Sequence, residues 1–350
     1  MFYEGKMKET KREIQSDLIR VVAMLFVISL HVPTNLGERH VYLDNLKTIV
    51  ILTCNGMFFM LSGKYNLRFQ REKEHPYRDF YSKKVISILL PFIIYTIVVY
   101  VCNMDMANWN FTVAVKDYMR ILLERNTTNH LWFMYQLIGM LISAPFLAIL
   151  LQSMKATDMK KMLLVALGWN FVSMTLIHDI MGYQFYFAGW FLGGMIIYFV
   201  LGFCVDKIIT TKNHIKIACV LGLAGLLITF GKQCFFENKF SGVYDLAPAY
   251  ILFTVGMFVF LERVCIIKYD WLKVLIAFLA KHSFGVYVFH FYVIQWLGNR
   301  LHFPGVRYEI VSYVLSIVVV FVLSFAMSFA VDTLICTPVK KRLLKMGKMG

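Results

Sequence analysis

Long apolar stretches are the feature that most restricts what this chain can fold into. Ten of them are long enough to cross a bilayer, because a spanning helix needs about 20 mostly apolar residues. They lie at 17–33, 46–65, 85–103, 131–152, 161–178, 186–203, 215–231, 246–262, 273–297 and 308–335. Hydrophobic residues make up 59% of the 350 residues, above the roughly 45–50% usual for soluble domains. The sequence therefore predicts an all-α integral membrane protein, a single bundle of about ten transmembrane helices.

The basic residues predict the orientation of this bundle. Ten spans place both termini on one side, and a cytoplasmic location for them puts 25 of the 36 Lys and Arg residues inside and nine outside. The other two, Arg20 and Lys281, lie deeper within spans, whereas basic residues in the first or last two positions of a span are counted with the adjoining loop. Cytoplasmic loops of membrane proteins carry this excess of positive charge. Since the formal charge of +15 is spread over short loops and tails, we expect both termini in the cytoplasm and no nucleic-acid partner.

The chain is expected to form one domain. Residues 1–350 are predicted to be a single transmembrane unit with short basic cytoplasmic tails at 1–16 and 337–350. The longest outer loop, about 104–130, is predicted to contain a short interfacial helix. The seven cysteines are scattered, with no Cys-x-x-Cys pair and no His/Cys cluster, so neither a disulfide framework nor a metal site is predicted.

Two ionisable residues in the first predicted helix need an explanation, because a charge at mid-membrane costs roughly 2.5–3.5 kcal/mol. Arg20 and His31 are eleven residues apart, which places them within about 20° of one helix face and about 16 Å apart along the axis. An anion bound at Arg20 near the cytoplasmic rim would extend an arm to His31. The alternative is that Arg20 reaches headgroups and His31 caps the helix end beside Pro33.

A basic segment follows the second span. Ser62 and Gly63 lie near the end of the span, and Arg68 and Arg71 lie one helical turn apart just after it. Two guanidiniums at this place can bind phosphate oxygens through paired N–H groups. The simpler alternative is an ordinary basic loop on the cytoplasmic side.

The ninth span carries a polar stripe. Ser283, Tyr287 and His290 recur at steps of four and three residues and therefore share one helix face. A hydrogen-bonded contact between helices explains the stripe as well as a direct catalytic role does. His130 opens the fourth span, and Trp132, two residues later, is explained by anchoring at the membrane interface.

The order and spacing of these motifs resemble the acyltransferase-3 family of bacterial membrane O-acyltransferases. The residues that carry the resemblance are Asp17, Arg20, His31, Phe58, Phe59, Ser62, Gly63, Arg68, Arg71, Tyr81, Lys83, Lys84, Pro91, Trp132, Phe133, Ser283, Tyr287 and His290. They extend over nearly the full length of the chain. The chain departs from the family pattern at Lys84 and Ser87, where the family often has Arg, so its contacts to the donor are expected to differ.

The resemblance implies a multi-pass enzyme of the bacterial inner membrane. Its donor would be cytoplasmic acyl-coenzyme A, most often acetyl-coenzyme A, acting as a co-substrate with no permanently bound cofactor. Its acceptor would be a hydroxyl of a cell-surface or lipid-linked polysaccharide. Arg20, Arg68, Arg71 and Lys84 would hold the coenzyme A phosphates. The sequence is compatible with a homo-oligomer.

The same resemblance suggests the catalytic residues. His31 would act as general base, since an imidazole with a reference pKa of ~6.5 suits removal of a hydroxyl proton. Ser62, Tyr287 and His290 are unranked candidates for stabilising the oxyanion. Alternatively, His31 would carry the acyl group covalently.

A rival function comes from another class of protein. In a transporter or flippase for lipid-linked sugars or small amphiphiles, the same polar residues would line a substrate path. The halves of the chain lack matching Gly- or Pro-broken segments, which inverted-repeat transporters tend to have. A sensor or partner subunit without chemistry would leave the set of Arg20, His31, Arg68 and Arg71 unexplained.

Overall fold

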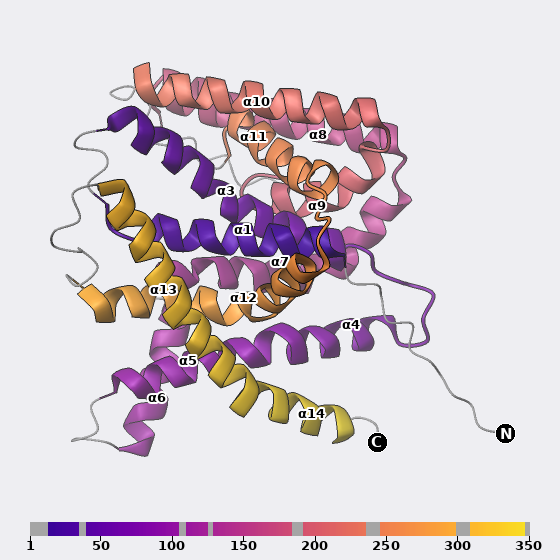
Figure 1. The fold of residues 1–350 in the computed structure, drawn as a ribbon. Helices are drawn as coiled ribbons and strands as arrows, with labels where there is room; N and C mark the ends of the chain where they lie inside the picture. The colour runs from indigo at the N-terminus through magenta and orange to yellow at the C-terminus, as the bar shows by residue number, and fades with distance from the viewer. Residues whose placement is uncertain are drawn as a thin grey trace.

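The computed structural model describes residues 13–34, 40–104, 110–124, 129–183, 192–235, 246–298 and 309–346. Within these ranges the protein consists of helices joined by short connections, without a β-strand (Figure 1). The α-helices are α1 Ile14–His31, α3 Val41–Asn66, α4 Pro76–Lys84, α5 Leu90–Asn103, α6 Phe111–Glu124, α7 Trp132–Ser153, α8 Ala156–Asn170, α9 Ile196–Ile208, α10 Lys212–Phe235, α11 Pro248–Val259, α12 Asp270–Leu297, α13 Glu309–Val331 and α14 Thr337–Met346. Shorter helical segments of other types are η1 Val85–Leu89, η2 Asn129–Leu131, η3 Phe171–Ile180, η5 Phe260–Val264 and η7 Asp332–Cys336.

Eight helical stretches in the described ranges are long and apolar enough to cross a membrane, which confirms a polytopic all-α protein. Each corresponds to one of the ten predicted spans. The predicted spans 186–203 and 246–262 differ. The first begins outside the described residues and contains α9 of 13 residues, about 20 Å long, and the second contains α11 of 12 residues continued by η5. Neither of these two helices is among the eight stretches that are long and apolar enough to cross a membrane. The count of about ten spans and the orientation of the bundle therefore stay predictions.

The centre of the bundle is formed by α1, α3 and α12. Helix α1 packs against α3 and α12, α3 packs against α9, and α10 packs against α11. In the most apolar part of α3, 56% of the residues are buried, against 17% in α10. Helix α10 therefore presents most of its apolar surface outward, as expected for contact with lipid, and runs along one edge of the bundle (Figure 1).

The two ends of the bundle are defined by α1 and α3, which run in opposite directions. We call the end at which α1 begins and α3 ends the terminal end, since both chain termini lie toward it in Figure 1. At the opposite end, α1 finishes at His31 and α3 starts at Val41. The helix expected within residues 104–130 is present as α6.

Glycines allow α3 and α9 to approach closely. A Cβ atom on Gly63 would lie 1.7 Å from the Phe199 carbonyl oxygen, and one on Gly202 would lie 1.8 Å from the Met60 carbonyl oxygen. No side chain fits into such gaps. Small residues at membrane helix interfaces allow this backbone-to-backbone packing, so Gly63 of the Ser-Gly motif has a packing role.

A buried polar network attaches α12 to its neighbours. His282 Nδ1 on α12 lies 2.6 Å from Asp332 Oδ2 of η7, and the Tyr95 hydroxyl on α5 donates to Asp332 Oδ1 at 2.6 Å. The Ser328 hydroxyl on α13 donates to the His282 carbonyl oxygen at 2.9 Å. Polar groups away from water must be paired, so these bonds favour one position of α12, the helix that carries Tyr287 and His290.

Candidate active site

A large cavity at the terminal end lies between the start of α1, the end of α3, the following loop and α4. Its volume is about 900 Å³, and it is lined by Glu13, Arg20, Tyr65, Asn66, Arg68, Phe69, Gln70, Lys73, Pro76, Asp79, Phe80, Lys83 and Lys84. Five of these side chains are cations and two are carboxylates, so the cavity attracts anions. We call it the basic cavity.

Arg20 and Arg68 flank one aromatic ring in the basic cavity. Their guanidinium carbons lie 5.7 and 5.8 Å from the centroid of the Tyr65 ring, within the range of a cation–π interaction. Arg20 Nη1 donates to buried Asp17 Oδ1 at 2.8 Å, and Arg68 Nη2 donates to Asp206 Oδ2 at 2.6 Å. Since a guanidinium has five N–H donors, these contacts orient both cations and leave donors for a bound anion.

An ion-pair network supports this wall of the cavity. Buried Lys64 on α3 pairs with Glu262 of η5, and its Nζ lies 2.9 Å from Glu13 Oε2. Arg263 Nε donates to Glu262 Oε2 at 2.8 Å, and Arg263 also pairs with Asp206. Burial raises the pKa of the Glu13 carboxyl, but hydrogen bonding and charge from Lys64 outweigh it and hold that pKa below its ordinary value. The network thus attaches the start of α1 to α3, α9 and η5.

The other two predicted phosphate ligands differ in their positions. Lys84 lines the basic cavity, with its Nζ 5.2 Å from the Phe80 ring centroid. Arg71 is exposed and does not line it. Lys73 and Lys83 do, and of these the sequence analysis noted only Lys83, as a family residue without a role. The sequence feature that could have indicated Lys73 and Lys83 is the dense basic segment between the second and third spans, to which both belong.

A second, smaller cavity extends from Arg20 into the bundle. It has a volume of about 170 Å³ and is lined by Arg20, Phe58, Phe133, Met134, Leu137, Ser283, Phe284 and Tyr287. Apart from Arg20, Ser283 and the Tyr287 hydroxyl, this lining is apolar. Arg20 lines both cavities, so the two are adjacent at its side chain. We call the smaller one the apolar passage.

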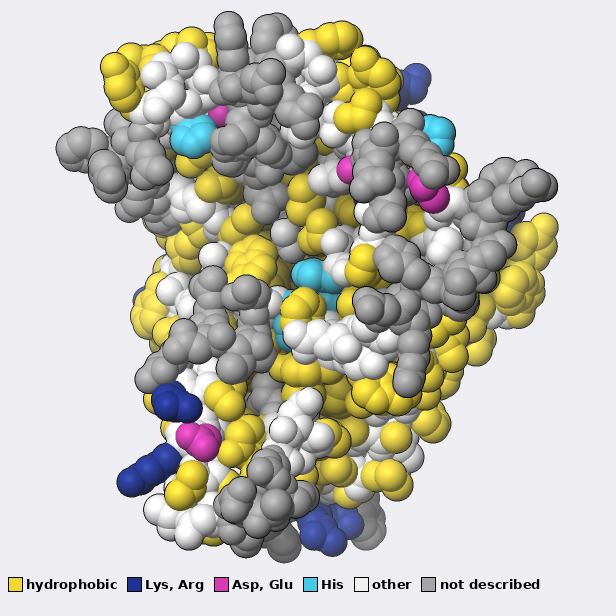
Figure 2. Space-filling model, turned by 90° about the vertical axis from the view of Figure 1, so that its left-hand side faces the viewer, with side chains coloured by type: hydrophobic (Ala, Val, Ile, Leu, Met, Phe, Trp, Pro, Cys, Tyr) yellow, Lys and Arg dark blue, Asp and Glu magenta, His cyan; other side chains and the backbone are white. Residues whose placement is uncertain are grey.

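Three histidines meet beyond the apolar passage, at the opposite end of the bundle. The Tyr287 ring centroid lies 6.0 Å from that of His290 and 6.1 Å from that of His130. His31 and His290 have ring centroids 5.0 Å apart, and His130 and His290 have theirs 5.4 Å apart. His130 and His290 are buried and His31 is half-buried. Figure 2, which views this end, shows histidine side chains near the centre of the face.

The carbonyl groups around this histidine cluster determine where the neutral rings carry their protons. A carbonyl oxygen only accepts, so a ring nitrogen beside one must be protonated. His290 Nδ1 lies 2.6 Å from the Tyr287 carbonyl oxygen, and His31 Nδ1 lies 2.9 Å from that of Val27. His290 Nε2 therefore has a lone pair, and at 3.3 Å it shares the single His31 Nδ1–H with the nearer Val27 carbonyl oxygen. His31 Nε2 also keeps a lone pair, and none of the described residues forms a hydrogen bond with it.

His130 is a member of the cluster to which the sequence analysis gave no role. Its Nε2 lies 3.3 Å from the Val288 carbonyl oxygen and therefore carries the proton. Its buried Nδ1 has no hydrogen-bond partner in the described part of the chain. The Tyr287 hydroxyl donates to the His130 carbonyl oxygen, which attaches the entry of α7 to α12. The sequence feature that could have indicated a role for His130 is its position as an ionisable residue at the start of a span.

The structure brings together most of the predicted catalytic residues. His290 lies beside His31, and Tyr287 lies beside His290 on α12. Ser62 does not, because it lies one turn before Asn66 near the terminal end of α3, whereas His31 ends α1 at the opposite end. The Ser62 hydroxyl accepts from Asn66 Nδ2 at 3.0 Å, and Asn66 lines the basic cavity.

Comparison with known proteins gives one match. A family model described as an acyltransferase domain, Acyl_transf_3, matches residues 13–332. No curated protein and no solved structure matches the chain. The matched range includes every residue that lines the basic cavity and the apolar passage, together with the three histidines.

Proposed function

Because the chain belongs to the acyltransferase-3 family, we propose that this multi-pass membrane acyltransferase moves an acetyl group from cytoplasmic acetyl-coenzyme A to a hydroxyl of a cell-surface or lipid-linked polysaccharide. One observation carries the proposal: Arg20 lines both the basic cavity and the apolar passage, and Tyr287 adjoins both the passage and the histidines. A donor with a phosphate head and a slender arm matches this order of a basic cavity, an apolar passage and a histidine cluster. The terminal end would face the cytoplasm, and the membrane would be the bacterial inner membrane.

The basic cavity suits the phosphate groups of the donor. Arg20 and Arg68 are held by carboxylates and by Tyr65, so little side-chain entropy is lost when they bind an anion. Lys73, Lys83 and Lys84 add positive charge to the other walls. The uncharged pantetheine arm would follow the apolar passage past Ser283 to Tyr287.

His31 has the proton arrangement of a general base. Its unprotonated Nε2 would take the proton from the acceptor hydroxyl as that oxygen attacks the thioester carbon. The carbon–sulfur bond then breaks, and the proton passes to the departing thiolate. His290 Nε2 would stabilise the positive charge on His31 by accepting from its Nδ1–H. Direct attack of the same lone pair on the thioester, giving an acyl-histidine, is the alternative.

Tyr287 is the best supported donor to the oxyanion. It is the only one of the three predicted candidates that lines the apolar passage, and its hydroxyl would exchange the His130 carbonyl for the thioester oxygen. His290 uses its single N–H within its own helix turn, and Ser62 lies toward the terminal end. No metal or bound cofactor is needed for this chemistry.

The test uses purified protein in proteoliposomes supplied with labelled acetyl-coenzyme A on the terminal side. We expect His31→Ala to abolish transfer of label to glycan while leaving donor binding intact, because the phosphate contacts are about 16 Å away along α1. His40→Ala, which changes an exposed histidine beyond the end of α1, is the matched control. Near-normal turnover by His31→Ala would remove His31 from the mechanism. Movement of a glycolipid without ester formation would favour the transporter or flippase.

A further inference from the structure

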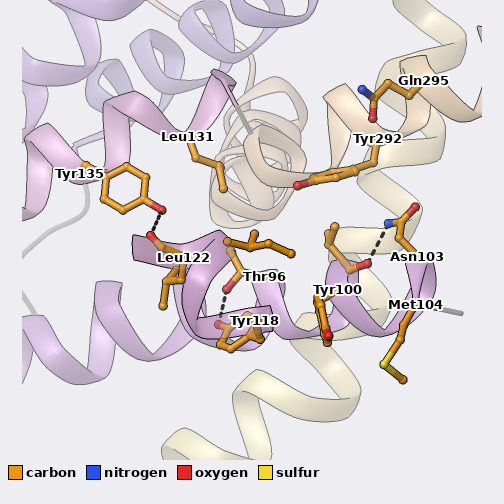
Figure 3. A pocket seen from close by; sticks show the side chains of 12 residues that line it. Thr96, Tyr100, Asn103, Met104, Tyr118, Leu122, Leu131, Tyr135, Tyr292 and Gln295 are labelled. Atoms are coloured by element: carbon orange, nitrogen blue, oxygen red, sulfur yellow. Dashed lines mark hydrogen bonds between the residues drawn. The ribbon is translucent and has the colours of Figure 1, made fainter. Parts of the chain in front are cut away.

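A third cavity lies at the opposite end, beside the histidine cluster. It has a volume of about 270 Å³ and lies between α5, α6, α7 and α12 (Figure 3). Its lining consists of Thr96, Val99, Tyr100, Asn103, Met104, Tyr118, Ile121, Leu122, Leu131, Tyr135, Tyr292 and Gln295. It shares no lining residue with the basic cavity or the apolar passage, so the donor route does not account for it.

The polar groups of this cavity fall into two sets. Some are already paired: the hydroxyls of Tyr118 and Thr96 lie 2.8 Å apart, and Asn103 Nδ2 donates to the Val99 carbonyl oxygen at 2.8 Å. The hydroxyl of Tyr292 and the amide of Gln295 form no hydrogen bond with any described residue. Figure 3 shows Gln295 and Asn103 on one side of the cavity, with Tyr292 between Gln295 and the cavity interior. Aromatic faces thus lie next to amide groups that are able to bind a ligand.

This cavity is adjacent to the proposed reaction centre. Leu131 directly follows His130, and the Tyr292 ring is edge-on to the His130 ring with centroids 5.5 Å apart. Tyr292 lies two residues after His290 on α12. A ligand in the cavity would therefore present its nearest groups to the histidines. One wall is α6, which is not among the eight candidate spans.

We propose that this cavity binds one sugar ring of the acceptor, an inference that rests on the proposed function. The flat apolar faces of a pyranose pack on tyrosine rings, while its hydroxyls need amide and hydroxyl partners such as Gln295, Tyr292 and Asn103 Oδ1. A lipid acyl chain would leave these polar groups unused. The volume is just below the usual 300–1,000 Å³ of small-molecule sites, which suits a single ring and not an oligosaccharide.

The experiment measures sugar binding without any donor. The full chain in nanodiscs is titrated with methyl glycosides of glucose, galactose, mannose, rhamnose and N-acetylglucosamine, followed by saturation-transfer NMR. We expect at least one glycoside to bind, and Gln295→Ala and Tyr292→Leu each to weaken it about tenfold, as for loss of a hydrogen bond or a stacking face. Tyr42→Leu, at an exposed tyrosine near the start of α3, is the matched control and should bind normally.

Binding of acetyl-coenzyme A by each variant confirms that it is folded and separates the two proposals. A wild-type protein that binds acetyl-coenzyme A but none of the glycosides would overturn the sugar site and leave the donor chemistry intact. Equal glycoside binding by wild type and both variants would also overturn it. So would binding of a spin-labelled phospholipid in the cavity in place of a glycoside. Failure to bind acetyl-coenzyme A would instead count against the proposed function.

Discussion

Replacing His290 tests whether one histidine of the cluster supports another. His290→Ala removes the Nε2 acceptor that lies 3.3 Å from His31 Nδ1. Before reaction this hydrogen bond joins two neutral rings, and in the transition state of the proposed mechanism His31 carries a positive charge. Hydrogen bonds to charged groups contribute about 1.5–3 kcal/mol, against about 0.5–1.5 kcal/mol for neutral ones, so the loss falls mainly on the transition state. Because the Val27 carbonyl oxygen keeps part of the hydrogen bond to His31 Nδ1, the loss is at most this difference of about 1–1.5 kcal/mol, a fall in kcat of up to roughly tenfold.

The assay is transfer from labelled acetyl-coenzyme A in proteoliposomes, with kcat and the donor KM measured separately. The donor KM should stay within about twofold, because the basic cavity begins at Arg20, about 16 Å from His31 along α1. His290→Gln, whose amide oxygen can still accept a proton, should recover part of the rate. An unchanged kcat would show that His290 does not act through His31, and a raised donor KM would place it in the donor site.

Three further outcomes follow from the packing and the charges. Arg68→Ala should raise the donor KM about tenfold and more so at low salt, where screening is weak, whereas Arg71→Ala should leave it nearly unchanged because Arg71 lies outside the basic cavity; steady-state kinetics at several ionic strengths decides between them. Lys64→Met should lower the free energy of unfolding by about 1.5–3 kcal/mol, the contribution of a hydrogen bond to a charged group, since it leaves buried Glu262 with Arg263 as its partner, and Lys64→Met combined with Glu262→Leu should recover part of it in thermal unfolding. Gly63→Ala should prevent the α3–α9 contact and lose extractable folded protein, while Gly139→Ala, with open space at its Cβ, should not.

Local sequence determined the elements of this protein. The eight described stretches that qualify as spans coincide with apolar runs, because in lipid every backbone N–H and C=O must be paired inside the helix. The helical repeat also placed residues correctly within one element. Arg20 and His31 lie on α1, and Tyr287 and His290 both face the histidine cluster.

Contacts between elements were the part that the sequence predicted least. His130 on η2 and His31 on α1 both contact His290 on α12, yet the three residues are separated by at least 99 positions in the chain. Ser62 belongs to the same motif as residues of the site but faces the terminal end, because α3 runs antiparallel to α1. Arg71 lies one turn from Arg68 in the sequence, but the chain leaves the helix at Leu67 and separates them.

The sequence by itself determined that this chain is a helical membrane protein, which residues carry unusual polarity, and to which family it belongs. These properties depend on composition, period and motif order along the chain. The tertiary structure alone decided that Arg20 lines two cavities, that three histidines from different helices share one site, and that a tyrosine-lined cavity adjoins them. The reason is physical: helix periodicity sets the direction of a side chain about its own axis, whereas the partner it meets depends on how the helices pack.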